Sequence, residues 1–168
     1  ELAQSGKGIV TASQVSEHDI ARVYLKELVD EGKLIHSERG IYVLPDSWDD
    51  EFFVLQYKYS KGIFSHETAL FLHGYSDQTP AIITMTFPYG YNNQLLAKKI
   101  IMKKAIAEVY ALGQCSLASP AGHEIRVYCI EKTLCDIVRN SRHSDMQRII
   151  PAMKQYSKFK GKNIPLLM

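Results

Sequence analysis

Residues 8–44 constrain the fold most, because they carry the signals of two helices and a hairpin in one short stretch. Thr11 is a good N-cap for a short helix over residues 12–15. Ser16 and Asp19 have the spacing of a capping box, with Ser16 accepting from the Asp19 amide. This pattern predicts a second, longer helix that runs to about Glu31.

The second predicted helix has one apolar face and ends at a glycine. Its apolar residues recur at helical spacing; they are Ile20, Tyr24, Leu25, Leu28 and Val29. Gly32 stands where a glycine commonly ends a helix. Residues 33–37 and 41–44 are predicted strands, joined by a tight turn over residues 38–40. A short helix, a turn, a longer helix and a β-hairpin form the plan of a winged helix-turn-helix.

The polar residues of this segment predict DNA binding. A recognition helix must fit a major groove about 12 Å wide, so one face and its N-terminal turn stay polar. The predicted DNA-contacting residues are Ser16, His18, Arg22 and Lys26 on the helical part, and Lys33, His36 and Arg39 on the wing. Glu17 and Asp19 would repel phosphates. A plain helix and hairpin, or a module that binds another protein, are the alternatives.

The remainder of the chain predicts a second domain with helices and strands. Residues 47–51 form an acidic hinge, so we predict a winged helix-turn-helix domain over 1–46 and an α+β domain over 47–168. The predicted helices are 51–59, 65–72, 130–139 and 145–156, and the predicted strands are 81–87, 99–104, 114–118 and 124–128. The expected fold class is therefore α+β, with a small mixed sheet in the second domain.

Basic residues accumulate toward the C-terminus. Residues 139–162 contain a single acid, Asp145. Five of the basic residues are predicted to add phosphate contacts on a bent DNA; they are Arg139, Arg142, Arg148, Lys154 and Lys158. The alternative is an ordinary solvated face, which is the usual meaning of a charge run.

Composition excludes several other classes of protein. The 168 residues are 46% hydrophobic and carry a net charge of +2, which fits a globular chain and is too mild to indicate nucleic acid by itself. The cysteines number three and form no C-x-x-C pair, which argues against disulfides and zinc and favours the cytoplasm. No apolar run reaches the roughly 18 residues of a membrane span, and no signal peptide is visible.

The residues suited to catalysis form no convincing set, so we predict a protein that is not an enzyme. His66, Glu67 and His73 suggest a metal, but no H-E-x-x-H motif accompanies them. Residues 124–126, Glu-Ile-Arg, only approach a nuclease pattern, and no clear acidic partner stands beside them. No phosphate-binding glycine loop is present. The sequence therefore predicts no catalytic residues, no metal and no cofactor.

Short motifs occur along the chain in a fixed order. They are Gly8-Ile-Val-Thr11, Gly32-Lys-Leu34, Arg39-Gly-Ile-Tyr42, Ile63-Phe-Ser-His66, Ala69-Leu70, His73-Gly74, Asp77, Pro80, Ser119-Pro-Ala-Gly122, Arg126-Val-Tyr128 and Glu131-Lys-Thr-Leu-Cys-Asp136. Their order and spacing resemble the AbiE abortive-infection antitoxin family, the AbiEi-type transcriptional regulators of type IV toxin-antitoxin systems. The likeness extends from Gly8 to about residue 160.

The resemblance implies a specific biological role. Members of the family repress their own operon by binding inverted repeats in the promoter, and they counteract a nucleotidyltransferase toxin without a stable complex, which supports phage resistance. Against the family pattern, the first helix of the winged domain and the C-terminal end both look truncated. The alternative function is a winged-helix transcription factor with a ligand-sensing second domain, which a cavity with convergent polar groups would favour.

Overall fold

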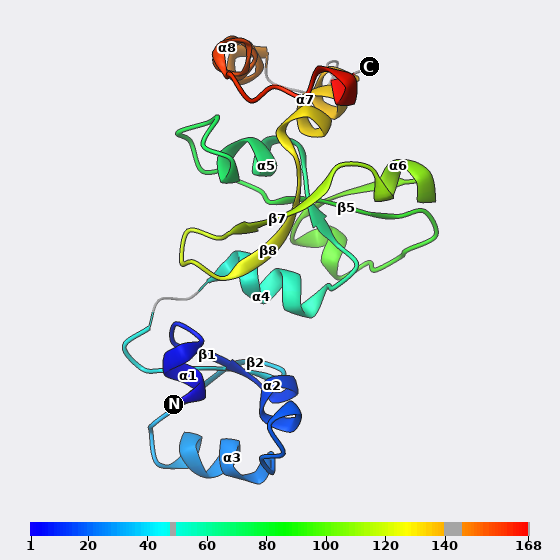
Figure 1. The fold of residues 1–168 in the computed structure, drawn as a ribbon. Coiled ribbons are helices and arrows are strands. Elements are labelled where there is room, and N and C mark those ends of the chain that lie inside the picture. Colours follow the sequence, from blue (N-terminus) through cyan, green and yellow to red (C-terminus); the bar gives the residue numbers. More distant parts are fainter. Residues whose placement is uncertain (48–49, 140–145, 168) are drawn as a thin grey trace. The chain divides into compact units, whose positions relative to one another are not determined.

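The chain folds into two compact units built from helices and small sheets, as a computed structural model shows (Figure 1). The structure describes residues 1–47, 50–139 and 146–167. Unit 1 comprises Glu1–Lys58 together with Ala118–Glu124, and unit 2 comprises Tyr59–Leu117 and Ile125–Met168. The predicted α+β class is confirmed.

Unit 1 places its helices around a three-stranded antiparallel sheet. Its elements are α1 (Leu2–Ser5), β1 (Ile9–Thr11), α2 (Ala12–Glu17), α3 (Val23–Asp30), β2 (Ile35–Glu38), β3 (Ile41–Val43) and α4 (Glu51–Lys58). The strand order is β1-β3-β2, so β3 is central. The predicted hairpin is present, whereas β1 was not predicted.

The ends of the helices in unit 1 follow from local residue chemistry. The Thr11 hydroxyl accepts from the Gln14 amide while the Gln14 side chain accepts from the Thr11 amide, so α2 begins with a capping box at the predicted N-cap. Gly32 has a φ of +71° and donates to the Val29 carbonyl just beyond α3. This left-handed conformation suits glycine and ends the helix where expected.

The predicted capping box at Ser16 and Asp19 is wrong. Ser16 lies inside α2, where its hydroxyl donates to the Ala12 carbonyl at 3.0 Å, and Asp19 adopts a left-handed φ of +55° in the connection. Helix α3 begins only at Val23 and has no side-chain cap. The later start also changes the apolar face, because Ile20 and Tyr24 are 40% and 54% exposed instead of buried.

Both faces of the small sheet are covered. Neighbouring residues of a strand point to opposite faces, so Ile9 and Val10 of β1 enter two different clusters. Val10 packs with Val15 and Leu25 from the helices. Ile9 packs on the face that α4 covers through side chains that include Phe53. Helix α4 is therefore part of the hydrophobic core of unit 1.

Unit 2 is built on a five-stranded mixed sheet. Its elements are β4 (Ile63–Phe64), α5 (His66–Leu72), β5 (Thr84–Pro88), η1 (Leu96–Lys98), β6 (Ile101–Ala105), α6 (Ala107–Ala111), β7 (Gln114–Ala118), β8 (Glu124–Tyr128), α7 (Ile130–Arg139), α8 (Met146–Lys158) and η3 (Ile164–Leu167). The order is β6-β5-β4-β8-β7, with β4 antiparallel to β5 and parallel to β8. The predicted mixed sheet is confirmed; strand β4 within it and the short helix α6 outside it were not predicted.

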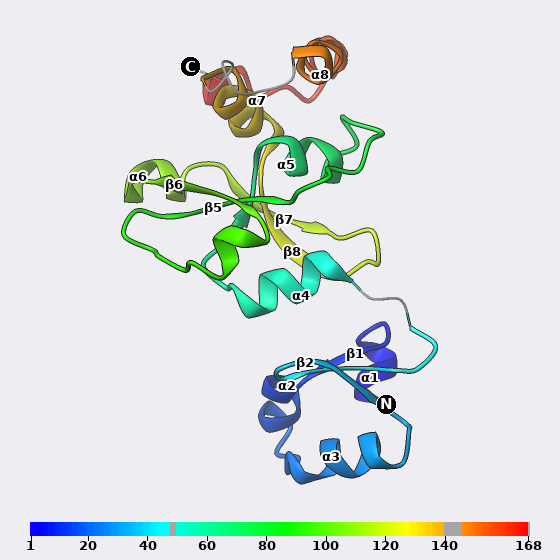
Figure 2. The same cartoon turned by 180° about the vertical axis from the view of Figure 1, so that it is seen from behind.

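The helices α5, α7 and α8 lie on one side of this sheet (Figures 1 and 2). Leu70 of α5, Leu134 of α7 and Tyr156 of α8 share one buried cluster. Glu131 of α7 joins the same region through polar contacts, because its carboxylate accepts from the Tyr156 hydroxyl at 2.9 Å and from the Asn163 amide at 3.2 Å. Hydrophobic and charged contacts therefore hold α7 and α8 together.

Among the described residues, no helix is long and apolar enough to cross a membrane.

Candidate nucleic-acid interface

Three of the predicted DNA-contacting residues lie around the end of α2. The Arg22 Nε donates to the Ser16 hydroxyl at 2.8 Å, and His18 Nδ1 lies 2.9 Å from the Gln14 carbonyl oxygen. All three predicted side chains are exposed. The structure therefore brings Ser16 and Arg22 together, with part of the guanidinium left for a ligand.

Helix α3 exposes polar and apolar side chains together. Lys26 follows Arg22 by four residues, so the two basic residues are neighbours on one side of the helical segment. Val23 and Tyr24 are also exposed there. The sequence pattern places both Tyr24 and Leu25 on the apolar face; Leu25 is buried as predicted, whereas Tyr24 is exposed.

The wing residues have different surroundings. Arg39 is exposed in the turn between β2 and β3, where Gly40 has a φ of +79°. His36 lies against Tyr42, with ring centroids 5.0 Å apart. Lys33 forms an exposed ion pair with Glu31 at 2.7 Å, an interaction that water screens strongly and that leaves the lysine available to a phosphate.

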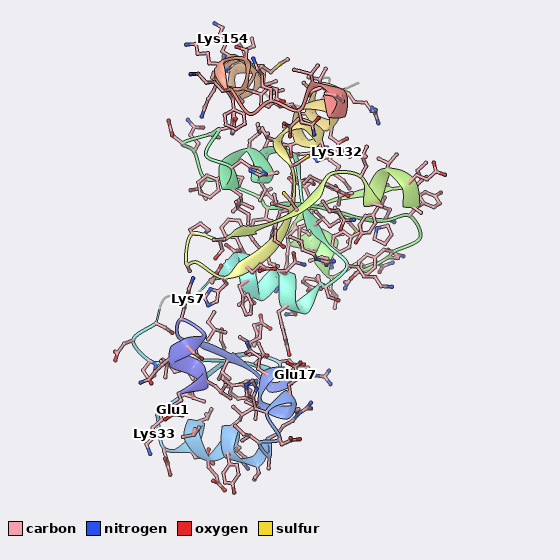
Figure 3. All side chains as sticks on the ribbon, in the orientation of Figure 1. Glu1, Lys7, Glu17, Lys33, Lys132 and Lys154 are labelled. Atoms are coloured by element: carbon pink, nitrogen blue, oxygen red, sulfur yellow. The ribbon has the colours of Figure 1, made fainter. Side chains whose placement is uncertain are left out.

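The C-terminal candidates lie in unit 2. Arg139 ends α7, and Lys154 and Lys158 project from α8, where Figure 3 labels Lys154. These three side chains are exposed. Arg142 and the side chain of Arg148 lie outside the described residues. The predicted second basic surface is therefore described for three of its five residues.

Electrostatics limit what the N-terminal segment alone can do. Residues 1–45 contain five lysines and arginines against seven aspartates and glutamates. Glu17 is exposed beside the predicted contacts and accepts from the Ser13 hydroxyl. A net attraction to phosphate must therefore come from individually placed cations and not from the overall charge of this segment.

A buried polar cluster in unit 1 was not predicted. The Asp50 carboxylate accepts a short hydrogen bond from the Ser119 hydroxyl and lies 2.6 Å from His123 Nδ1. His123 Nε2 lies 3.1 Å from the Gly6 carbonyl oxygen, and Lys7 donates to the Gly122 carbonyl. These contacts tie residues 118–124 to the N-terminal part of unit 1. No sequence signal connects groups so far apart along the chain.

The histidines that suggested a metal have other surroundings. His73 Nε2 lies 2.8 Å from the Tyr128 carbonyl oxygen, and His66 Nδ1 lies 3.1 Å from the Ser65 hydroxyl. Within the described ranges, no group of three or more histidine, cysteine, aspartate or glutamate side chains is placed to hold a metal ion. The geometry of these histidines thus reflects hydrogen bonding within unit 2.

Comparison with solved structures adds information on the fold. The crystal structure of the RV2827C protein from Mycobacterium tuberculosis is similar, with a TM-score of 0.62 and 16% identity, over 99% of this chain and 67% of that one. At this identity the likeness concerns the fold alone. No curated protein matches the sequence.

Comparison with family models concerns the N-terminal segment. Residues 1–45 match the family described as "Transcriptional regulator, AbiEi antitoxin". The match spans α1 to β3, which includes the first three motifs noted in the sequence. The description of this family is that of a transcriptional regulator. Residues 1–45 thus carry the sequence signature of the AbiEi antitoxin transcriptional regulators, which confirms the resemblance to the AbiE antitoxin family.

Proposed function

We propose that this protein is a DNA-binding antitoxin that represses its own toxin-antitoxin operon. In this proposal residues 1–46 form a winged helix-turn-helix that binds inverted repeats in the promoter. Residues 47–168 form the domain that counteracts a nucleotidyltransferase toxin, without a stable complex, and so supports phage resistance. The match of residues 1–45 to the AbiEi regulators is the observation that carries the proposal.

The arrangement of unit 1 supports a DNA-binding role. Two consecutive helices, α2 and α3, are followed by the β2–β3 hairpin, which is the order of a winged helix-turn-helix. Arg22 and Lys26 would enter the major groove, and Arg39 would reach the phosphate backbone or the minor groove from the wing. Exposed Tyr24 would add an apolar contact on the same helix.

The basic residues of unit 2 provide additional phosphate contacts in this proposal. Arg139, Lys154 and Lys158 are exposed, and each neutralised phosphate releases counterions from the duplex. Residues 1–45 have more acids than bases, so phosphate contacts from unit 2 would supply attraction to DNA that the net charge of residues 1–45 does not. Such contacts would raise affinity without carrying sequence information.

Replacing Arg22 or Arg39 with alanine is expected to weaken binding to the upstream promoter about tenfold or more for each residue, because each loses a charged contact to base or phosphate. A mobility-shift assay at several salt concentrations measures the effect. Each lost phosphate contact should also lower the slope of log K against log salt by about one.

The matched control is Lys61→Ala, which removes an exposed positive charge from unit 2 that belongs to none of the candidate sets. Its promoter affinity should stay close to that of the parent. Circular dichroism verifies that all variants fold. If Arg22→Ala and Arg39→Ala bind the promoter as tightly as Lys61→Ala, the proposed interface is wrong.

Growth assays test the antitoxin activity separately. Expressed from an unrelated promoter, the protein should restore growth to cells that produce the nucleotidyltransferase encoded beside it. The double variant Arg22→Ala/Arg39→Ala should restore growth equally, since the proposal places antitoxicity in residues 47–168, while repression of a promoter–reporter fusion is lost. Failure of the parent protein to restore growth would contradict the antitoxin assignment.

A further inference from the structure

Unit 2 contains a small polar cavity whose lining residues, apart from Arg139, do not belong to the predicted DNA contacts. Its volume is about 340 Å³, at the lower end of the range for small-molecule sites. Its polar lining comes from four elements: His66 of α5, Thr86 of β5, Lys103 and Lys104 of β6, and Lys132, Asp136 and Arg139 of α7. The remaining lining is apolar, from Ala105, Ile106 and Val109.

The sheet and helix α7 bring these side chains together for geometric reasons. Thr86 and Lys103 are register partners in the parallel pair β5–β6, so their side chains lie on the same face of the sheet. Lys132, Asp136 and Arg139 follow one another at intervals of four and three residues, which places them on one face of α7. Figure 3 labels Lys132 on this helix.

The charges of the cavity are unbalanced. The cationic side chains of Lys103, Lys132 and Arg139 line it, and Asp136 is the single carboxylate among the lining residues. Asp136 pairs with Lys132, whose Nζ donates to its two oxygens at 2.5 and 2.6 Å. Among the described residues, Lys103 and Arg139 have no ion-pair partner. The cavity therefore has a surplus of positive charge that an anion would neutralise.

His66 is held in an unusual conformation at this cavity. Its φ is +53°, in the left-handed region that a bulky side chain rarely adopts, and the residue is only 4% exposed. The Ser65 hydroxyl lies 3.1 Å from its Nδ1 and in turn accepts from the Thr86 hydroxyl at 2.9 Å. Strained residues held in this way occur preferentially at ligand sites.

The imidazole is suited to hydrogen bonding as a neutral group. Burial lowers the pKa of His66 below its ordinary value; the Asp136 carboxylate opposes this effect, and the Lys103 ammonium reinforces it. At neutral pH the ring thus offers one donor and one acceptor and adds no charge to the cavity.

We propose that this cavity of unit 2 binds the phosphate group of a small phosphorylated molecule. Arginine and lysine side chains are the usual partners of phosphate oxygens, and the neutral imidazole of His66 can donate one further hydrogen bond. The burial of His66 and Lys132 favours the terminal phosphate of a small molecule over the backbone of a duplex. The site lies wholly in unit 2 and goes beyond the proposed function, since it needs neither promoter nor toxin.

Isothermal titration calorimetry on the full chain tests the site with three probes at constant ionic strength: inorganic phosphate, AMP and adenosine. We expect inorganic phosphate and AMP to bind with a Kd of about 1 mM or tighter, and adenosine to bind at least about tenfold more weakly than AMP. Phosphate should also compete with AMP, because the phosphoryl group is the shared determinant. Absence of binding by both phosphate-bearing probes overturns the proposal.

Variants locate the binding. Lys103→Gln and Arg139→Gln should each weaken AMP binding about tenfold or more, as should His66→Asn, since asparagine tolerates the left-handed backbone. The control Lys98→Gln removes an exposed lysine outside the cavity and should leave affinity unchanged. Thermal unfolding without ligand confirms that each variant folds. Equal weakening by Lys98→Gln, or unchanged affinity in Lys103→Gln and Arg139→Gln, contradicts a defined site.

A competition experiment distinguishes a site for small molecules from a surface that binds the phosphates of a nucleic-acid backbone. A short duplex without the promoter sequence should not displace AMP at moderate salt. Displacement by this duplex at comparable phosphate concentration would assign the cavity to nucleic acid and overturn the proposal. Promoter binding by the parent protein is measured in a separate assay. A protein that fails to bind AMP but binds the promoter would therefore contradict the phosphate site and not the proposed function.

Discussion

Replacing Asp50 with alanine is expected to lower the free energy of unfolding of unit 1 by about 3–5 kcal/mol. The side chains of Asp50 and His123 are 1% and 8% exposed and lie 2.6 Å apart. Removing the carboxylate leaves the imidazole and the Ser119 hydroxyl buried without their acceptor. The Phe53 amide, which donates to Asp50 Oδ1 at 3.0 Å in the first turn of α4, also loses its partner.

Urea denaturation followed by circular dichroism measures the loss, and hydrogen exchange by mass spectrometry locates it. Faster exchange is expected in residues 1–58 and 118–124. The control is Asp46→Ala, which removes an exposed carboxylate from the same unit and should change stability by no more than about 0.5 kcal/mol. If Asp50→Ala and Asp46→Ala are equally stable, the buried cluster contributes nothing to unit 1.

Replacing Glu131 with alanine is expected to destabilise unit 2 by about 3 kcal/mol, because the buried Tyr156 hydroxyl and the Asn163 amide both lose their acceptor. Glu131→Gln keeps an oxygen acceptor and should cost about half as much. Urea denaturation measures both, with Glu108→Gln on the exposed part of α6 as the matched control. A Glu131→Ala protein as stable as this control would show that the contacts between α7 and α8 are not limiting.

The Glu131 effect should depend on pH. Burial raises the pKa of Glu131, but hydrogen bonds from backbone amides and the Tyr156 hydroxyl outweigh this, and the pKa lies below its ordinary value of 4.5. Since the folded state holds the proton less tightly, the ionised carboxylate stabilises the fold above pH 4.5, and this contribution is lost as the pH falls through the lower folded value. The difference in the free energy of unfolding between the parent and Glu131→Gln should therefore become smaller below pH 4.5.

Tyr156 remains a donor throughout this experiment. Burial, together with the hydrogen bond and charge of Glu131, raises the pKa of the Tyr156 hydroxyl to about 12. Its proton is thus retained at every pH where the protein would be measured. If the difference in the free energy of unfolding between the parent and Glu131→Gln stays constant from pH 7 to about pH 3, the assigned role of the Glu131 charge is contradicted.

The sequence predicts those elements whose signals are local. Strand β8 has buried Ile125 and Val127 at alternate positions, and α7 follows with a clear amphipathic pattern, so the bounds of both are predicted correctly. Strand β4 has only two residues, Ile63 and Phe64, and exists because it pairs with β5 on one side and β8 on the other. A strand made by distant partners has no period of its own to detect.

In the candidate DNA interface, too, the sequence predicts features that have local signals and misses those that depend on the path of the chain. The exposure of Arg22 and Arg39 follows from local pattern, whereas the bond between Arg22 and Ser16 depends on the path of the connection between α2 and α3. That path could not be predicted, because the Ser16–Asp19 spacing imitates a capping box while Ser16 belongs to the preceding helix. The cavity around His66 needs residues from four separate elements to meet, which no single motif encodes.

The two-part composition of unit 1 has a consequence for synthesis on the ribosome. When residues 1–58 have emerged, Asp50 still lacks His123, which follows it by 73 positions. At about 5–20 residues per second, several seconds pass before the partner segment is translated. During this time the Asp50 carboxylate, which is buried in the complete fold, stays in contact with water. A chain whose translation stops before residue 118 would therefore lack part of unit 1.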